Sequence, residues 1–136
     1  MPAPYSGGCR CGAIRYECNA EAMFSAYCHC RDCQYASGGP FAVIAMFPGD
    51  TVRFEGAAST YAVRGESGGT VRRNFCPTCG TPVWSDVEGG PGWVAIKAAT
   101  FDDPSWLQPV AEIWTDSAQP WARIPGTVTR FARNPQ

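Results

Sequence analysis

The segment Cys76-Pro77-Thr78-Cys79-Gly80 constrains the fold more strongly than any other part of this sequence. Two cysteines with two residues between them, one of them proline, and a glycine directly afterwards are typical of a tight metal-binding turn. Such a turn aims two thiolates at one ion and supplies two of the four ligands of a tetrahedral structural zinc site. The other two ligands must therefore come from elsewhere in the chain.

The remaining cysteines form a pair, a triple and one isolated residue. They are Cys9 and Cys11, then Cys28, Cys30 and Cys33, and finally Cys18. Two four-cysteine sites need eight cysteines, but only seven are clustered. The seven can therefore be divided into one complete site with four ligands and a second site with three. Structural zinc sites are closed, whereas catalytic sites keep an open position beside three protein ligands. Spacing alone does not decide which clusters share an ion.

Two other interpretations of the cysteines compete with one structural and one reactive zinc. Four disulfides are the first, but the N-terminal residues lack the basic and apolar regions of an export signal, and disulfides are rare in reducing compartments. The second interpretation is that both zinc sites are structural and neither is reactive, with Cys18 or His29 as the eighth ligand. We interpret Cys18 as a buried thiol, because it shares a strand face with Ile14 and Tyr16. His29 is the only histidine, and a lone histidine is more often structural than catalytic.

The composition fits one globular domain over residues 1–136. A charged fraction of 17%, a hydrophobic fraction of 45% and a net charge of −1 exclude global disorder. No run approaches the ~20 apolar residues of a membrane span, so we expect a cytoplasmic protein without a membrane partner. Ten arginines are dispersed along the chain and lysine occurs once, which argues against the clustered positive surface of nucleic-acid binding.

The apolar pattern is mostly strand-like, with short runs separated by glycine and proline turns. Strands are predicted within residues 13–18, 41–47, 51–54, 60–64, 71–75, 82–85, 93–97, 110–114 and 127–131. One short helix is predicted over residues 30–37, because glycines followed by a proline come directly afterwards. The sequence therefore predicts a mainly β, sandwich-like or barrel-like domain that would gain stability from bound metal.

Three motifs together resemble the glutathione-dependent formaldehyde-activating family, which includes the domain of centromere protein V. They lie at residues 7–16, 28–42 and 73–81, and the resemblance runs from about residue 7 to residue 121. The resemblance implies a small zinc-dependent β-tent fold with two Zn²⁺ per chain. It assigns the structural zinc to Cys9, Cys11, Cys76 and Cys79. It assigns the catalytic zinc, with an open fourth position, to Cys28, Cys30 and Cys33.

The resemblance also places the turn Ser37-Gly38-Gly39 close to that open position. We expect Phe41 and Trp121 to wall the pocket, and Gly38 and Gly39 either to donate N–H groups to an oxyanion or simply to end the helix. Two departures from the family are visible. The family often has a histidine near the position of Glu112, and the chain is shorter than the glutathione-specific enzymes.

The expected chemistry follows from a zinc ion with three thiolates. Its formal charge of −1 weakens its Lewis acidity, and Arg10 and Arg31 are candidates to offset that charge. A soft open position favours a thiolate, which would add to an aldehyde to give an S-hydroxyalkyl adduct. This is formally the chemistry of a carbon–sulfur lyase, and the resemblance implies a small thiol such as glutathione and an aldehyde such as formaldehyde as substrates. Asp32 or Glu112 would transfer the proton during this addition.

The alternative to an enzyme is a non-catalytic, zinc-stabilised binding module.

Overall fold

Strands dominate the computed structural model, which describes residues 2–65, 68–88, 92–126 and 128–135. The strands are β1 (Tyr5–Gly8), β2 (Arg15–Cys18), β3 (Phe24–Cys28), β4 (Ala42–Pro48), β5 (Val52–Glu55), β6 (Ser59–Arg64), β7 (Thr70–Phe75), β8 (Pro82–Val87), β9 (Trp93–Lys97), β10 (Ala111–Ile113) and β11 (Thr129–Arg130). The helices are α1 (Arg31–Ser37) and the 3₁₀ turns η1 (Gly49–Thr51), η2 (Ala98–Thr100), η3 (Pro104–Trp106) and η4 (Thr115–Ser117). The predicted fold class, mainly β with short helical turns, is confirmed.

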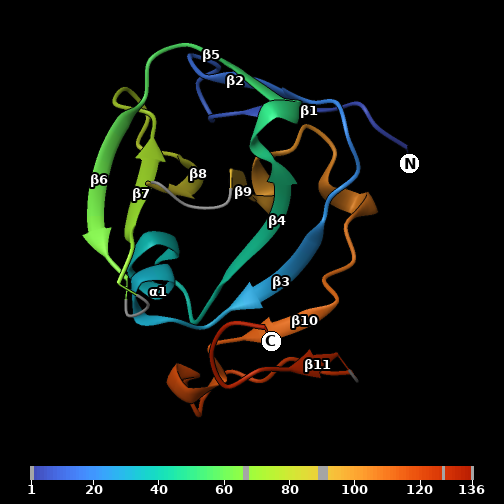
Figure 1. Cartoon of the computed structure of the whole chain (residues 1–136), viewed down its shortest axis with the longest axis vertical. Coiled ribbons are helices and arrows are strands. Elements are labelled where there is room, and N and C mark those ends of the chain that lie inside the picture. The colour runs from blue at the N-terminus through green and yellow to red at the C-terminus, as the bar shows by residue number, and fades with distance from the viewer. Residues whose placement is uncertain (1, 66–67, 89–91, 127, 136) are drawn as a thin grey trace.

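The strands form two sheets. The smaller one has the order β1-β2-β5, and the larger one has the order β11-β10-β3-β4-β9-β8-β7-β6. Neighbouring strands are antiparallel except at β10, which pairs in parallel with both β3 and β11. In Figure 1 the small sheet lies at the top, and the large sheet curves from β6 at the left through β4 to β10 and β11 at the bottom.

The two faces of the large sheet have different roles because side chains alternate along each strand. Ala45 and Phe47 of β4, together with Val94 and Ile96 of β9, are buried in one apolar cluster with residues of the small sheet. The small sheet therefore covers one face of the large sheet. The opposite face of β4 and β9 is lined by Ile44, Met46, Trp93, Ala95 and Lys97, and it forms the floor of a cavity.

Aromatic rings fill the core between the sheets. Tyr5 stacks on Trp106 with the ring centroids 4.1 Å apart, and Phe101 meets Tyr5 edge to face at 6.2 Å. Gly7 has no side chain where the backbone of β1 passes this cluster, and a Cβ there would lie 2.3 Å from the hydroxyl oxygen of Tyr16. Glycine is therefore required in β1 for the close approach of Tyr16.

The helix α1 positions two cysteines at its N-terminal end. Cys30 is its N-cap, and its Sγ accepts a hydrogen bond of 3.3 Å from the backbone N–H of Cys33. Gly38 ends the helix in the left-handed conformation, with φ at 71°, and its N–H donates to the carbonyl of Gln34 at 2.8 Å. The predicted helix and its glycine stop are therefore confirmed.

The predicted strands are found within one or two residues at most boundaries, although β11 is shorter than predicted and residue 127 lies outside the described residues. Two strands were not predicted, namely β1 and β3. Within the described ranges, the structure contains no helix with the length and apolar character that crossing a membrane requires.

Candidate metal centres

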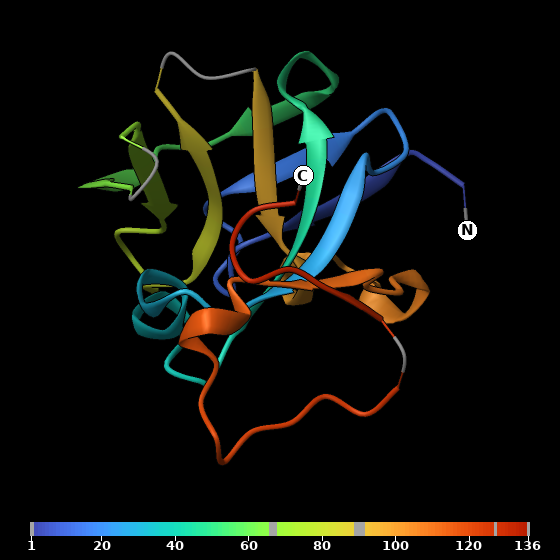
Figure 2. The same cartoon turned by 60° about the horizontal axis from the view of Figure 1, so that its bottom comes forward.

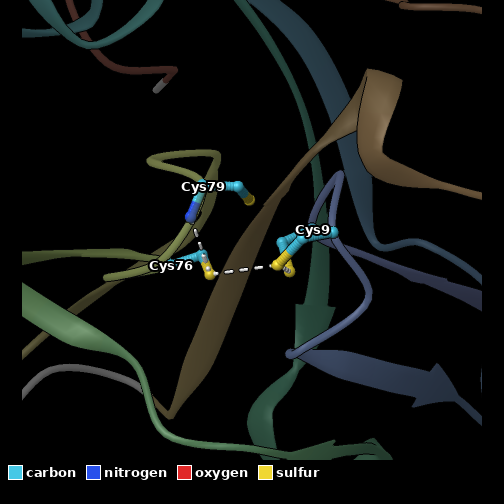
Figure 3. A group of neighbouring side chains, drawn as sticks. Cys9, Cys76 and Cys79 are labelled. Carbon is cyan, nitrogen blue, oxygen red and sulfur yellow. Dashed lines mark hydrogen bonds between the residues drawn. The ribbon is translucent and has the colours of Figure 1, made fainter.

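Four cysteines from two distant turns converge between the sheets. Cys9 and Cys11 lie in the turn between β1 and β2, whereas Cys76 and Cys79 lie in the turn between β7 and β8. Their Sγ atoms all lie within 4.8 Å of one another, with Cys11 Sγ 3.7 Å from Cys9 Sγ and 3.8 Å from Cys76 Sγ. Figure 3 shows the two turns facing each other with their sulfurs between them. We call these residues the four-cysteine group.

Backbone N–H groups point at the sulfurs of this group. Ile14 N–H donates to Cys9 Sγ at 3.2 Å, and the N–H groups of Thr78 and Cys79 donate to Cys76 Sγ at 3.4 and 3.5 Å. Hydrogen bonds donated to a sulfur favour its thiolate form. The turns are therefore built to hold thiolates, which are the form of cysteine that binds metal ions.

The second turn of the four-cysteine group also needs its glycine. Gly80 has φ at 79°, in the left-handed region, and its N–H donates to the carbonyl of Cys76 at 2.9 Å. The hydroxyl of Thr81 lies 3.1 Å from Cys79 Sγ, and this hydrogen bond lowers the pKa of Cys79 to about 5. Cys79 is therefore prepared as a thiolate at neutral pH.

The other three clustered cysteines form a separate group. Cys28 ends β3, Cys30 caps α1 and Cys33 lies in the first turn of α1, and their Sγ atoms lie within 4.8 Å of one another. Within the described residues, no histidine, carboxylate or further cysteine joins these sulfurs as a fourth donor. This three-cysteine group therefore has the donor set of an open site.

The three-cysteine group lines a cavity of about 640 Å³. The floor of the cavity is the face of the large sheet opposite the aromatic core, and residues at the start of α1 form one wall. Asn134 and Pro135 also line it, and Figure 2 shows the C-terminal segment passing in front of β4 and β9. Pockets of roughly 300–1,000 Å³ suit small-molecule ligands. The three sulfurs are therefore placed where a small molecule can reach them.

Two cations that sequence reasoning missed lie beside the three sulfurs. Arg73 Nη1 is 3.8 Å from Cys33 Sγ, and Lys97 lines the same cavity. Hydrogen bonds from the thiols of Cys28 and Cys30 lower the pKa of Cys33, and the positive charges of Lys97 and Arg73 lower it further. A signal for Lys97 was present, since the only lysine of the chain ends an apolar strand.

The arginines predicted for this role lie elsewhere or are otherwise engaged. The backbone N–H of Arg10 donates to Thr81 Oγ1 at 3.1 Å, beside the four-cysteine group. Arg31 lines the cavity, but its guanidinium donates to Gln34 Oε1 and lies 5.0 Å from the ring centroid of Tyr35. Arg73 and Lys97 therefore replace Arg10 and Arg31 as the charges that face Cys33.

A family model described as "Glutathione-dependent formaldehyde-activating enzyme" matches residues 4–117. The chain belongs to this formaldehyde-activating family. A crystal structure of a Rhodobacter sphaeroides protein is similar at 22% identity and a TM-score of 0.58, over 76% of this chain and 91% of that one, and it supports the fold alone. No curated protein matches the chain. The resemblance stated from the three motifs is thus confirmed.

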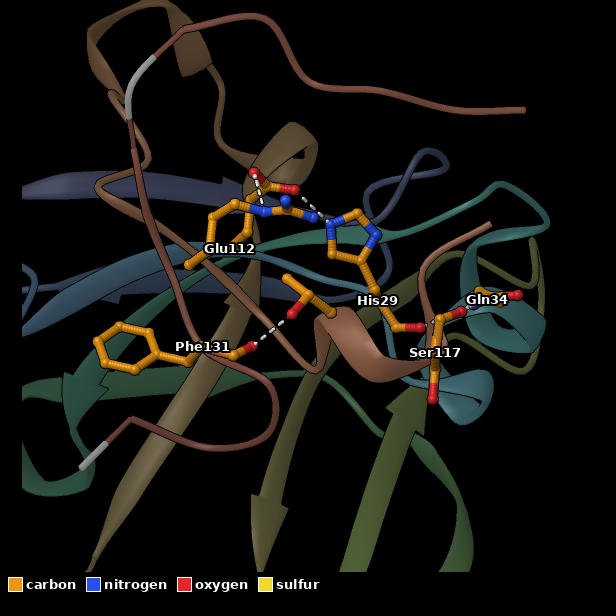
Figure 4. A network of polar contacts seen from close by, with 7 residues as sticks. His29, Gln34, Glu112, Ser117 and Phe131 are labelled. Carbon is orange, nitrogen blue, oxygen red and sulfur yellow. Dashed lines mark hydrogen bonds and ion pairs between the residues drawn. The ribbon is translucent and has the colours of Figure 1, made fainter. Parts of the chain in front are cut away.

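Glu112 forms a buried polar chain with two other side chains. Its Oε1 lies 2.9 Å from His29 Nε2, and its Oε2 lies 3.3 Å from Nε of Arg130 (Figure 4). His29 and Glu112 are 1% and 6% exposed. The hydrogen bond between His29 and Glu112 and the ion pair between Glu112 and Arg130 join the loop after β3 to β10 and β11, which supports a structural role for His29.

Replacing Glu112 with alanine should lower the free energy of unfolding by about 2 kcal/mol, because it leaves the buried Nε2 of His29 without its hydrogen-bond partner. Urea unfolding followed by circular dichroism measures the change. Glu17→Ala is the control, since Glu17 forms an exposed pair with Arg53 at 4.0 Å, and its loss should cost less than about 1 kcal/mol. Equal changes in the two variants would contradict a structural role for the buried chain.

Gln34 ties α1 to the segment that follows β10. Its Nε2 donates to the carbonyls of His29 at 2.7 Å and Ser117 at 3.0 Å, and its Oε1 accepts from Gln119 at 2.9 Å. Figure 4 shows Gln34 and Ser117 on facing elements. This buried amide therefore holds η4 against the helix that carries Cys30 and Cys33.

The residues expected to contact substrate are placed less favourably. The Gly38 N–H donates to Gln34, and the Gly39 N–H donates to Ser37 Oγ at 3.1 Å, so both groups already have acceptors. Phe41 packs edge to face on the ring of His29 at 5.5 Å. Trp121 is 71% exposed. None of Ser37, Gly38, Gly39, Phe41 and Trp121 is among the described residues that line the cavity, so their substrate-binding role stays a prediction.

Cys18 belongs to neither group of sulfurs. It is fully buried with Ile14 and Tyr16 in the core, and burial raises the pKa of its thiol to about 12. The interpretation of Cys18 as a buried thiol is confirmed.

Proposed function

We propose that this protein is a zinc-dependent carbon–sulfur lyase that makes or breaks S-hydroxyalkyl adducts of a small thiol and a small aldehyde. Membership of the formaldehyde-activating family supports glutathione and formaldehyde as the substrate pair. The observation that carries the proposal is the difference between the two cysteine groups. Four sulfurs from two turns supply a complete tetrahedral donor set, whereas three sulfurs line a cavity and lack a fourth donor within the described residues.

The cysteine sulfurs of both groups form donor sets that suit zinc. Four thiols within 4.8 Å, with N–H groups directed at their sulfurs, fit a closed structural site. Cys28, Cys30 and Cys33 would hold the second ion, as three protein ligands do in a catalytic site. A zinc ion bound there would supply a soft Lewis-acidic position at which a thiol loses its proton near neutral pH.

The residues around the three-cysteine group would position and neutralise the reactants. Arg73 and Lys97 would offset the negative charge of three thiolates. Addition forms a bond between the substrate's thiolate sulfur and the aldehyde carbon, while the carbonyl electron pair moves to oxygen, which takes up a proton. Of the two carboxylates proposed for that proton, Asp32 lines the cavity, whereas Glu112 is bonded to His29 and Arg130. We therefore assign proton transfer to Asp32.

A reducing compartment fits this chemistry. All eight cysteines are free thiols in the structure, and free thiols persist in the cytoplasm rather than in oxidising compartments. We therefore propose a cytoplasmic location, where small thiols are also available as substrates.

Zinc stoichiometry together with exchange measurements tests the proposed function. We expect two zinc ions per chain by elemental analysis. We also expect the protein to accelerate exchange between glutathione and its hydroxymethyl adduct in an NMR exchange experiment with formaldehyde. One zinc per chain, or two with no acceleration, would contradict the enzyme and favour a non-catalytic, zinc-stabilised binding module.

A further inference from the structure

Two buried cationic nitrogens in the cavity have no acceptor. Within the described residues, neither Lys97 Nζ nor Arg73 Nε has a hydrogen-bond partner, although both atoms are shielded from solvent. An ammonium or guanidinium N–H buried without a partner is costly. Lys97 and Arg73 come from β9 and β7, which flank β8, so both point into one space from separate strands. A ligand with a negatively charged acceptor would remove this cost.

The charges that line the cavity leave room for such a ligand. The charged side chains are the cations Arg31, Arg73 and Lys97 and the carboxylate of Asp32. A zinc ion with three thiolates carries a charge of −1, so the loaded site and Asp32 together offset two of the three cations. One positive charge remains before a substrate binds, so the cavity favours a negatively charged ligand.

We propose that Arg73 and Lys97 bind a carboxylate of the substrate, so that the protein selects acidic thiols or acidic aldehydes over neutral ones. This inference rests on the proposed function, because it concerns the substrate of the three-cysteine group. Arginine and lysine both form charge-assisted hydrogen bonds with carboxylates, and such bonds are stronger than neutral ones. The carboxylate belongs either to the thiol or to the aldehyde, and the two sources share one recognition chemistry.

One of the two cations lies next to the sulfurs, since Arg73 Nη1 is 3.8 Å from Cys33 Sγ. A carboxylate bound by Arg73 therefore lies beside the three-cysteine group. Mercaptoacetate and glyoxylate serve as probes because they are a small acidic thiol and a small acidic aldehyde, and 2-mercaptoethanol and glycolaldehyde are their neutral counterparts.

Calorimetric titration of the zinc-loaded wild-type protein tests the selection without measuring turnover. We expect mercaptoacetate to bind at least about tenfold more tightly than 2-mercaptoethanol, or glyoxylate at least about tenfold more tightly than glycolaldehyde. The first result assigns the carboxylate to the thiol, and the second assigns it to the aldehyde. Equal affinities within both pairs would overturn the inference and leave the proposed function intact. Failure of every probe to bind would overturn both.

Variants separate selection by these cations from direct contact between the carboxylate and the metal. In Arg73→Gln and Lys97→Met, the affinity for the acidic probe should fall by more than the affinity for the neutral probe, so that the ratio of the two affinities falls towards one. Arg72→Gln is the matched control. Arg72 directly precedes Arg73 on β7, and its partly exposed guanidinium pairs with Asp86. A preference that survives both substitutions would overturn the inference. Arg73→Lys and Lys97→Arg keep the positive charge and should keep the preference for the acidic probe. These two variants replace the neutral ones in the titration if a neutral variant does not fold.

Discussion

Cys79→Ser is expected to abolish cooperative thermal unfolding, as is complete removal of metal by a strong chelator. Cys79 belongs to the four-cysteine group, which fastens the small sheet to the turn between β7 and β8. Structural zinc contributes about 10–16 kcal/mol in small peptides, and a whole domain is stable by only about 5–15 kcal/mol. Loss of the ion therefore removes an amount comparable to the total stability, and we expect the three sulfurs left in Cys79→Ser to hold it too weakly to keep the domain folded. Circular dichroism during heating measures the outcome.

Cys18→Ala is the control for this experiment, because Cys18 is a buried cysteine outside both groups. It removes one small side chain from the core and should lower the melting temperature by only a few degrees, in keeping with a loss of about 1 kcal/mol. An unchanged melting curve after complete zinc removal, or equal melting of the two variants, would show that the four-cysteine group does not hold the sheets together.

Cys30→Ser, in contrast, should leave a folded protein that has lost its activity. Cys30 caps α1 by accepting the N–H of Cys33, and serine is itself a favourable N-cap, so the helix keeps its first hydrogen bond. The three-cysteine group, however, loses one of its three sulfurs. Changes beyond the direct ligands already cost about 10–100-fold in metal affinity or activity, so we expect a loss of at least about 100-fold in adduct exchange.

The comparison of Cys30→Ser with Cys79→Ser decides whether the two groups have different tasks. We expect one variant to melt near the wild-type temperature with one zinc retained, and the other to be unfolded. If both variants unfold, or both stay folded and inactive, the division into a structural and a reactive group is wrong.

The local parts of the site could be predicted from the sequence. The turn at Cys76, the helix behind Cys30 and the burial of Cys18 each depend on a few neighbouring residues. Glycine and proline spacing and period-two alternation report on such features directly. Joining Cys9 and Cys11 to the turn at Cys76 required the family resemblance, because nothing in the spacing connects residues that far apart.

Long-range features were missed for physical reasons. β1 ends in Gly7 and Gly8, and glycine is uncommon in strands, yet Gly7 is needed there because Tyr16 approaches the backbone closely. Arg73 and Lys97 lie on strands that the sequence did predict. Their meeting at Cys33 depends on the order β9-β8-β7 in the large sheet, which no local pattern encodes. Trp121, which was expected to wall the pocket, is largely exposed, so its role at the site stays a prediction.

The separation of the two turns in the four-cysteine group also affects how a nascent chain matures. Cys11 and Cys76 are 65 residues apart, and a ribosome adding roughly 5–20 residues per second takes roughly 3–13 s to make that stretch. During this interval the thiols of Cys9 and Cys11 exist without their partners and are exposed to other metals and oxidants. Release of a chain that ends before Cys76 would leave the small sheet unanchored, so translation must pass Cys79 before folding can be completed.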